Sequence, residues 1–131
     1  MAEIALLTTA LLFGGMTLYS CAFAPFLFSV LPMETVRPVL RQAFPHFYLF
    51  VMATSGLAAL LAFFIDPITG AALAAIFATT VYARQILMPA INRAADAEDQ
   101  RRFKSLHGAS VVITLAHILI SGWILVRLFN G

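Results

Sequence analysis

The chain has 131 residues, of which 62% are hydrophobic and 11% are charged, and its formal net charge is +2. Soluble domains average about 25% charged and about 45–50% apolar residues, so this composition excludes an ordinary soluble domain and predicts a protein embedded in a lipid bilayer. A membrane-spanning helix needs about 20 mostly apolar residues, and the chain offers four such stretches. We therefore expect one all-α domain over residues 1–131, an integral membrane four-helix bundle with up-down topology.

The first two expected spans lie on either side of a short connection. The first covers about residues 4–31, and Pro25 near its end predicts a kink because proline lacks the amide N–H of a helical hydrogen bond. The second begins just after Pro45 and covers about residues 46–65, because the residue before a proline disfavours helix. The Asp-Pro pair that follows predicts a helix stop and a tight turn.

The third expected span covers about residues 68–88 and stops before Pro89, and the fourth covers about residues 106–129. The second and third spans are rich in small residues, which let helix backbones approach closely within a membrane. These residues are Gly56, Ala58, Ala59, Ala62, Gly70, Ala71, Ala72, Ala74, Ala75 and Ala78. Close helix packing is the favoured interpretation, and a narrow cavity for a flat ligand or cofactor is the alternative.

The connection over residues 92–105 is predicted to extend the third helix. Glu98 and Arg102 have the four-residue spacing of a weak helical ion pair. A solvated, self-paired hairpin is the favoured interpretation. The alternative is a docking surface for a cytoplasmic partner or for anionic lipid headgroups.

Basic residues indicate orientation, because cytoplasmic connections are enriched in Lys and Arg. Seven of the eight basic residues lie in or beside the two long connections: Arg37, Arg41, Arg84, Arg93, Arg101, Arg102 and Lys104. Only Arg127 lies toward the opposite side, with Glu3 and Asp66. We therefore predict a multi-pass protein of a bacterial-type inner membrane with both termini outside the cytoplasm. The basic excess is a topology signal and does not indicate nucleic-acid binding.

A polar stripe follows the last span. His107, Ser110, Thr114, His117 and Ser121 are spaced three or four residues apart, so they project within roughly an 80° arc of one helix face. Lipid cannot satisfy imidazole and hydroxyl groups. We therefore expect the stripe to face protein or trapped water.

His117 is the deepest imidazole of the chain, about 15 Å beyond His107 at 1.5 Å per residue. Burial in hydrocarbon favours its neutral form. One interpretation is a neutral imidazole that is hydrogen-bonded to a hydroxyl or carbonyl of a neighbouring helix, and the other is a ligand or proton-relay group. Thr114 and Ser121, one turn away on either side, are candidate partners within the stripe.

A polar pocket is expected at the cytoplasmic ends of the second, third and fourth spans. The candidate ligand-binding residues from depth and spacing are His107, Arg84, Ser110, Asn92, Thr114 and His117. Arg84 has two interpretations: an anchor that snorkels to the headgroups, or a fixed cation that faces the bundle. In the second case it pairs with Asp96 or Glu34, or attracts an anionic substrate near His107.

Haem is an alternative cofactor. His46 and His107 begin the second and fourth spans, which run in the same direction, so two imidazoles on facing helices could bracket a haem b iron. His117 with an unidentified second ligand is a variant of this hypothesis. The chain has no Cys-x-x-Cys-His attachment motif, and it lacks the clustered ligands of a structural zinc site.

Three segments together resemble the transmembrane-protein-205-like family. They are residues 44–48 (FPHFY), residues 82–89 with Asn92-Arg93-Ala94 after them, and residues 103–111 (FKSLHGASV). That family consists of small four-helix membrane proteins, and one eukaryotic branch is associated with drug resistance, so the resemblance points toward export or trafficking. By position it implies a cytoplasmic-side cluster of Pro45, Tyr48, Arg84, Asn92, His107, Gly108 and Ser110, and so adds Tyr48 to the candidate ligand-binding residues. It does not reach His117, and His46 stands where the family pattern has an aromatic residue, so the resemblance does not imply a haem site.

The sequence contains no Ser-His-Asp arrangement, phosphate loop or pair of intramembrane carboxylates, so we do not expect an enzyme. Three functions remain open. The first is the handling or transport of a small solute or metal ion by an oligomer, since one narrow bundle encloses little volume. The second is a non-catalytic accessory subunit of a larger membrane complex, and the third is a b-type haem protein.

Overall fold

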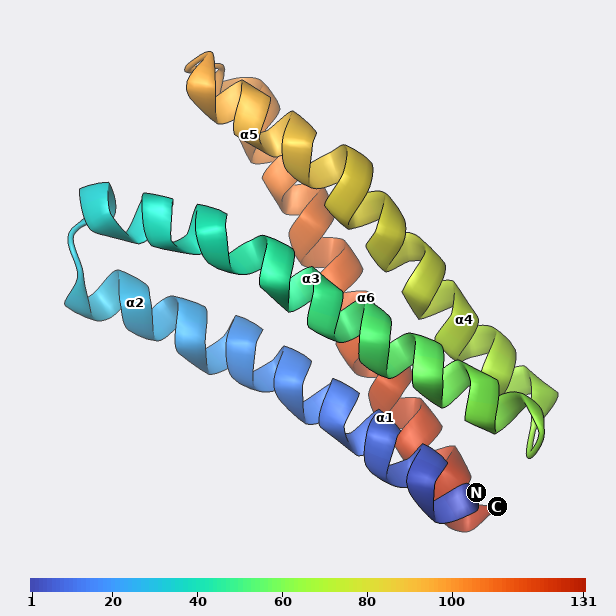
Figure 1. The fold of residues 1–131 in the computed structure, drawn as a ribbon. Coiled ribbons are helices and arrows are strands. Elements are labelled where there is room, and N and C mark those ends of the chain that lie inside the picture. The colour runs from blue at the N-terminus through green and yellow to red at the C-terminus, as the bar shows by residue number, and fades with distance from the viewer.

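A computed structural model describes all 131 residues, and every regular element in it is helical. Four helical segments are long and apolar enough to span a membrane: Ala2–Val30, Met33–Phe63, Pro67–Asp96 and Gln100–Asn130. Successive segments run in opposite directions, and the N- and C-termini lie together at one end of the molecule (Figure 1). The predicted all-α, four-helix membrane fold is confirmed.

The first segment is a long helix with a π-helical interruption. It consists of α1 (Ala2–Thr17), the π-helical segment η1 (Leu18–Phe23) and α2 (Ala24–Val30). Pro25 is the second residue of α2, directly after η1. A proline leaves one carbonyl of the preceding turn without its amide donor, and a local change to π hydrogen bonding lets neighbouring groups compensate. The disturbance predicted at Pro25 therefore takes the form of a widened turn before it.

The second segment, α3 (Met33–Phe63), is longer than predicted. The expectation that this helix starts at His46 is wrong, because the chain is already helical 13 residues earlier. The helix passes through Pro38 and Pro45. Each proline costs a backbone hydrogen bond of the helix, so other contacts must hold these first turns.

Packing and one side-chain hydrogen bond hold the extra turns of α3. Val36 and Leu40 are buried against Leu27 of α2. The Pro45 carbonyl accepts a hydrogen bond from Nε of Arg84 at 3.3 Å. Tertiary contacts thus override the local preference against helix next to proline, which explains why the predicted helix start was too late.

The third segment has the same plan as the first. It consists of α4 (Pro67–Tyr82), the π-helical segment η2 (Ala83–Leu87) and α5 (Met88–Asp96). The prediction that the helix ends before Pro89 is wrong, because Pro89 is the second residue of α5 and directly follows η2. A π-helical stretch again absorbs the missing amide donor.

A tight turn over residues 97–99 leads into α6 (Gln100–Asn130), which begins before the predicted position 106. Glu98 occupies the left-handed region with φ 56°, and the Asp99 carboxylate caps α6 by accepting from the Arg102 amide at 3.1 Å. The turn separates Glu98 from Arg102, and they form no ion pair. The third helix is thus extended as far as Asp96 and a hairpin follows, as predicted, but the predicted ion pair between Glu98 and Arg102 is wrong.

The core follows the hairpin of α3 and α4. The first helix, α1, packs against α3, and α6 packs mainly against α1 and α5, with fewer contacts to α4. In α3 the predicted role of small residues holds, since Ala58, Ala59 and Ala62 are buried. In α4, Gly70 is buried next to Phe63. Three alanines of α4 face outward: Ala71, Ala75 and Ala78. Close helix packing therefore explains the small residues of α3 and those on one side of α4, but not the outward-facing alanines of α4.

The end that carries the termini is tied together by one carboxylate. Asp66 caps α4 by accepting from the Ile68 amide at 3.2 Å and from the Thr69 hydroxyl at 2.7 Å. Arg127 of α6 pairs with the same carboxylate and lies over the Trp123 ring. The Arg127 guanidinium, followed by the Thr69 hydroxyl, lowers the pKa of Asp66 to about 2. These contacts join α6 to the turn between α3 and α4.

Candidate functional site

A small polar cavity lies between α3, α5 and α6. Its volume is about 60 Å³. A single water needs about 10–15 Å³ of such space, so the cavity accommodates a small polar molecule or group. Eight residues line it: Arg41, Phe44, Tyr48, Met88, Ile91, Asn92, His107 and Ser110. No carboxylate is among them, and Arg41 carries the one permanent charge of the lining.

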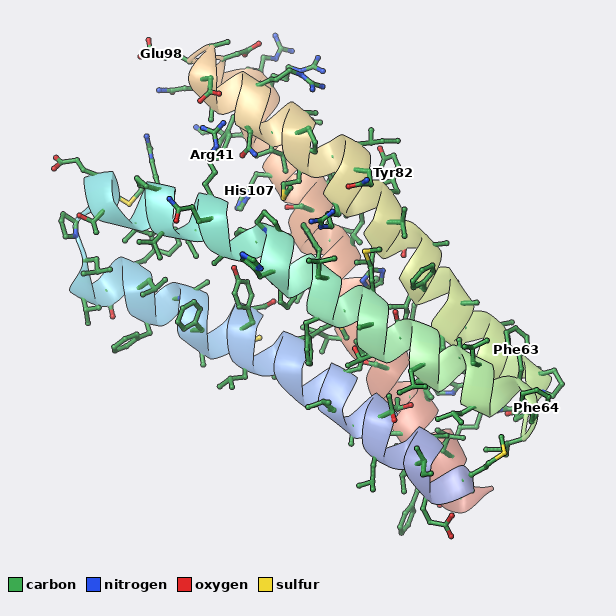
Figure 2. All side chains as sticks on the ribbon, in the orientation of Figure 1. Arg41, Phe63, Phe64, Tyr82, Glu98 and His107 are labelled. Atoms are coloured by element: carbon green, nitrogen blue, oxygen red, sulfur yellow. The ribbon has the colours of Figure 1, made fainter.

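Helical spacing brings these side chains to one place. Arg41, Phe44 and Tyr48 are three and four residues apart and therefore share a face of α3. The residues from α5 and α6 follow the same spacing. Arg41 and His107 lie near each other at the end opposite the termini (Figure 2). Arg41 reaches this face only because α3 stays helical through Pro45.

The polar groups of the cavity differ in their partners. Arg41 donates two hydrogen bonds to the Asp96 carboxylate at the rim, at 2.7 and 2.9 Å. The Ser110 hydroxyl donates to the His107 carbonyl of its own helix at 2.7 Å. The Tyr48 hydroxyl and the Asn92 amide take part in no hydrogen bond between side chains of the protein, and neither does the His107 ring. These three groups are thus available to a ligand.

His107 stands at the mouth of the cavity. The residue is exposed, and its ring is parallel to the Phe103 ring one turn earlier, with 5.7 Å between ring centres and 2° between planes. This stacking holds the imidazole beside the cavity, which it helps to line.

Four of the predicted pocket residues surround this cavity, namely Tyr48, Asn92, His107 and Ser110. Arg84 does not. Its Nε donates to the Pro45 carbonyl at 3.3 Å and its Nη1 to Gln85 Oε1 at 3.2 Å, so it ties η2 to α3. The proposed pairing of Arg84 with Asp96 is wrong, because Asp96 pairs with Arg41.

The polar stripe of α6 becomes more buried with depth. His107 is exposed, Ser110 and Thr114 are half-buried, and His117 and Ser121 are buried. The stripe therefore faces protein in its deeper half, as predicted. Thr114 lies one turn inward from the cavity and does not line it, so the cavity includes only the first two members of the stripe.

His117 is bonded to a neighbouring helix. Its Nε2 lies 2.6 Å from the Thr79 hydroxyl of α4, and that hydroxyl is also 2.8 Å from the Ala75 carbonyl. If Thr79 donates to the carbonyl, the imidazole donates to Thr79, which fits a neutral ring. This arrangement matches the first of the two interpretations of His117, the structural one. Thr114 and Ser121 are not its partners, and the Ser121 hydroxyl donates to the Ile118 carbonyl at 3.0 Å.

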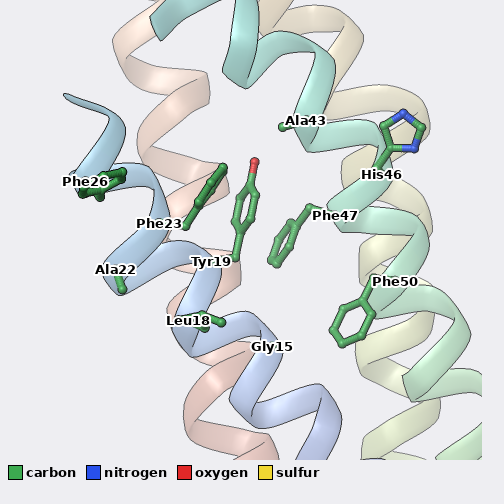
Figure 3. Close-up of a pocket in the computed structure, with 10 residues that line it drawn as sticks. All are labelled: Gly15, Leu18, Tyr19, Ala22, Phe23, Phe26, Ala43, His46, Phe47 and Phe50. Carbon is green, nitrogen blue, oxygen red and sulfur yellow. The ribbon is translucent and has the colours of Figure 1, made fainter. Parts of the chain in front are cut away.

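A second, apolar groove lies between the first segment and α3. Its volume is about 950 Å³, and Gly15, Leu18, Tyr19, Ala22, Phe23, Phe26, Ala43, His46, Phe47 and Phe50 line it. The Tyr19 and Phe47 rings stack with 4.1 Å between centres, as Figure 3 shows. The Tyr19 hydroxyl is buried and has no hydrogen-bond partner. The groove thus contains one buried polar atom without a partner, in a wall of mainly aromatic and small apolar side chains.

The two histidines of the haem hypothesis lie in different places. His46 lines the apolar groove, on the side of α3 away from the Tyr19–Phe47 stack (Figure 3), whereas His107 lines the polar cavity. They do not face a common space. His117 has Thr79 as its partner and no second imidazole.

Sequence reasoning missed Arg41 and Thr79. Arg41 carries a usable signal, because a helix drawn through Pro45 places it on the same face as Tyr48. Thr79 carries none, since a single sequence does not specify which faces of two helices meet. Its position four residues after Ala75 reads equally well as a hydroxyl bonded to its own helix.

One comparison with known proteins finds a match, at the level of a protein family. A family model described as a domain of unknown function (DUF4149) matches residues 7–100. No curated protein and no solved structure matches the chain. The matched region contains Arg41, Tyr48 and Asn92 but ends before His107, so the α6 side of the cavity lies outside it.

Proposed function

The chain belongs to the family of the domain of unknown function DUF4149, and we propose that it binds a small polar solute at the cavity between α3, α5 and α6 and passes it on without chemical conversion. One observation carries the proposal: Tyr48, Asn92 and His107, from three different helices, converge on one space without hydrogen-bond partners among the side chains. The Tyr48 hydroxyl and the Asn92 amide are not sealed from solvent, since the Tyr19 hydroxyl is the one buried side-chain polar atom without a partner. A ligand can therefore reach these groups and replace the water that satisfies them.

A solute fits this cavity better than a metal ion. The lining contains one imidazole and no carboxylate, and the structure has no group of three or more His, Cys, Asp and Glu side chains placed to hold a metal. Divalent ions favour carboxylate, thiolate and several imidazole ligands. The lining therefore favours a small polar solute over a metal ion.

Binding to the purified protein tests this function. A panel of small anionic, neutral and cationic solutes is screened for thermal stabilisation in detergent, and each hit is tested for flux in proteoliposomes. We expect Tyr48→Phe and His107→Ala each to weaken binding of a hit severalfold, because each removes a group that faces the cavity. Tyr82→Phe is the matched control, since Tyr82 is 48% exposed and lies outside the cavity. If every hit binds both cavity variants as it binds the unmodified protein, or if nothing binds, the proposal fails.

We further propose that the cavity opens to the cytoplasm and that both termini lie outside it, in a bacterial-type inner membrane. The support is the position of seven of the eight basic residues at or near the end that contains the α2–α3 and α5–α6 connections. Fusions of alkaline phosphatase and of a fluorescent protein to each terminus test this. Phosphatase activity at both termini is expected, and fluorescence at both would reverse the orientation.

The resemblance to the transmembrane-protein-205-like family is also a proposal. It is supported by the four residues of that pattern that surround the cavity, Tyr48, Asn92, His107 and Ser110. Arg84, which belongs to the same pattern, instead holds η2 against α3. If the two families share a function, Arg84→Ala should affect stability, whereas His107→Ala should affect solute binding. Equal loss of solute binding in both variants at unchanged stability would contradict this division.

A second candidate function is a non-catalytic accessory subunit of a larger membrane complex. The observation that favours it is the outward-facing row of Ala71, Ala75 and Ala78 on α4, because small residues let a further helix approach closely within a membrane. Purification from native membranes in a mild detergent tests it. A complex with other chains is expected, and a lone monomer would count against this candidate.

A further inference from the structure

We propose that the ligand of the polar cavity is an oxyanion, a carboxylate or phosphate group, and that Asp96 is a tethered carboxylate that competes with it for Arg41. This inference rests on the proposed binding function and names its ligand class. It also gives a role to an ion pair that the binding function alone does not use.

The lining of the cavity has the chemistry of an oxyanion site. Arg41 offers a planar fork of N–H donors, which matches the oxygens of a carboxylate or phosphate group. The Asn92 amide, the Tyr48 hydroxyl and a ring nitrogen of His107 can each donate a further hydrogen bond. With no carboxylate in the lining, a cation would face Arg41 without a counter-charge, whereas an anion would meet donors on three sides.

The Arg41–Asp96 pair already displays this mode of binding. Nη1 and Nη2 of Arg41 each donate to a different oxygen of the Asp96 carboxylate, at 2.7 and 2.9 Å. This is the two-point geometry that a free carboxylate would adopt. Asp96 is the last residue of α5 and lies outside the cavity lining. The Asp96 carboxylate therefore occupies, at the rim of the cavity, the place on Arg41 where a bound oxyanion would be held.

Exposure makes the pair exchangeable. The side chains of Arg41 and Asp96 are 47% and 61% exposed, so water screens both charges and the pair contributes little to stability. An incoming oxyanion that gains bonds from Asn92, Tyr48 and His107 can therefore replace Asp96 at low cost. When Asp96 is released, its charge returns to water at the end of α5.

This model predicts opposite effects for the two members of one ion pair. Loss of Arg41 removes the main donor, so oxyanion binding should weaken. Loss of the Asp96 charge removes the competitor, so oxyanion binding should tighten. If the pair served only to hold α3 against α5, both substitutions would loosen the cavity and weaken binding together.

Isothermal titration calorimetry of the full-length protein with inorganic phosphate, and separately with acetate, tests the model in a neutral detergent. We expect Arg41→Gln to weaken binding about tenfold or more and Asp96→Asn to tighten it about two- to fivefold. Arg93→Gln is the matched control, because it removes the same charge from an exposed position of α5 outside the cavity. If Arg41→Gln does not fold, Arg41→Lys keeps the charge without the fork and should still weaken binding.

The outcomes separate this inference from the binding function. Unchanged or weaker phosphate and acetate binding in Asp96→Asn would overturn the competitor role. A neutral or cationic solute whose binding depends on Tyr48 and His107, with no binding of either anion, would overturn the inference and leave the binding function standing. If the unmodified protein binds no solute of any charge, both the oxyanion inference and the binding function are overturned.

A lipid headgroup is a second source of the same oxyanion. Phosphate binding is therefore repeated in nanodiscs of phosphatidylcholine alone and of phosphatidylcholine with phosphatidylglycerol. Binding that is equal in both identifies a free solute as the ligand. A different result would identify the lipid phosphate as the natural occupant of Arg41: phosphate binds in phosphatidylcholine alone, this binding is lost when phosphatidylglycerol is present, and Arg41→Gln does not bind phosphate in either lipid. Both results support an oxyanion site.

Discussion

The two ends of the bundle differ in how their polar groups are satisfied. At the end with the termini, the Asp66 carboxylate is bonded to the start of α4 and paired with Arg127 of α6. At the other end, Tyr48, Asn92 and His107 face a cavity and have no partners among the side chains. The first, closed end therefore holds the helices together through internal contacts, whereas the second, open end leaves polar groups without side-chain partners.

The largest expected effect comes from adding a methyl group at the closed end. A Cβ at Gly70 would lie 2.9 Å from the Phe63 Cα, so Gly70→Ala forces α4 away from α3 and should cost about 1–3 kcal/mol of unfolding free energy. Thermal unfolding in a fixed detergent measures it. Gly108→Ala is the control at the open end, where no atom lies within 4 Å of the added group. It should stabilise α6 by about 0.5–1 kcal/mol, and a similar loss in both variants would contradict the comparison.

The hydrogen bond between His117 and Thr79 lies between the two ends. Thr79→Val should lower the free energy of unfolding by about 0.6 kcal/mol, and by at most about 1.7 kcal/mol, the average and the maximum for such bonds between membrane helices. Thr80→Val is the matched control, because the Thr80 hydroxyl bonds only the Ile76 carbonyl of its own helix, at 2.6 Å. In a His117→Leu background, Thr79→Val should cost less, and an unchanged cost would show that the two residues are not coupled.

Acid should loosen the closed end. The pKa of Asp66 is lowered to about 2 by Arg127 and Thr69, whereas a free aspartate in the unfolded chain has a pKa of about 3.9. The stabilisation is therefore complete above about pH 4 and declines as the pH falls toward 2. We expect the unfolding temperature to decrease over this range and Asp66→Asn to flatten the decrease.

Glu3→Gln is the control for this pH dependence. The Glu3 side chain is 88% exposed, and its nearest cation is the N-terminal amine at 3.8 Å. This variant should keep the acid-dependent decrease of the unmodified protein. A decrease that is equally steep in Asp66→Asn would assign the effect to other carboxylates.

The smallest expected effect lies in the turn beyond the open end. The Glu98 and Asp99 amides donate to the Ala95 and Ala94 carbonyls at 3.1 and 3.0 Å, a helix ending in which glycine is preferred at the first of the two positions. Glu98 adopts φ 56° there, so Glu98→Gly should stabilise the protein by about 0.5 kcal/mol. Glu98→Ala keeps the unfavourable φ and should bring no gain. A loss in Glu98→Gly would indicate that the carboxylate itself matters.

Much of the candidate site follows from the sequence. The position of helix ends at one membrane face and helical spacing predict that Asn92, His107 and Ser110 lie near each other, and the resemblance to the transmembrane-protein-205-like family adds Tyr48. Arg41 was missed and Arg84 was misplaced for one reason. The local preferences of proline predict that one helix starts after Pro45 and another ends before Pro89. In the structure, packing and π-helical turns let both helices continue through these positions.

Composition and spacing alone determined that this protein is a four-helix membrane bundle, because the transfer of each apolar segment into hydrocarbon depends on that segment and not on its neighbours. They also determined which face of α6 is polar. Only the tertiary structure decided that Thr79 meets His117, that Asp96 binds Arg41 and that His46 and His107 face different spaces. The reason is that the rotation and register of one helix against another depend on side chains far apart in the chain, and no local pattern specifies them.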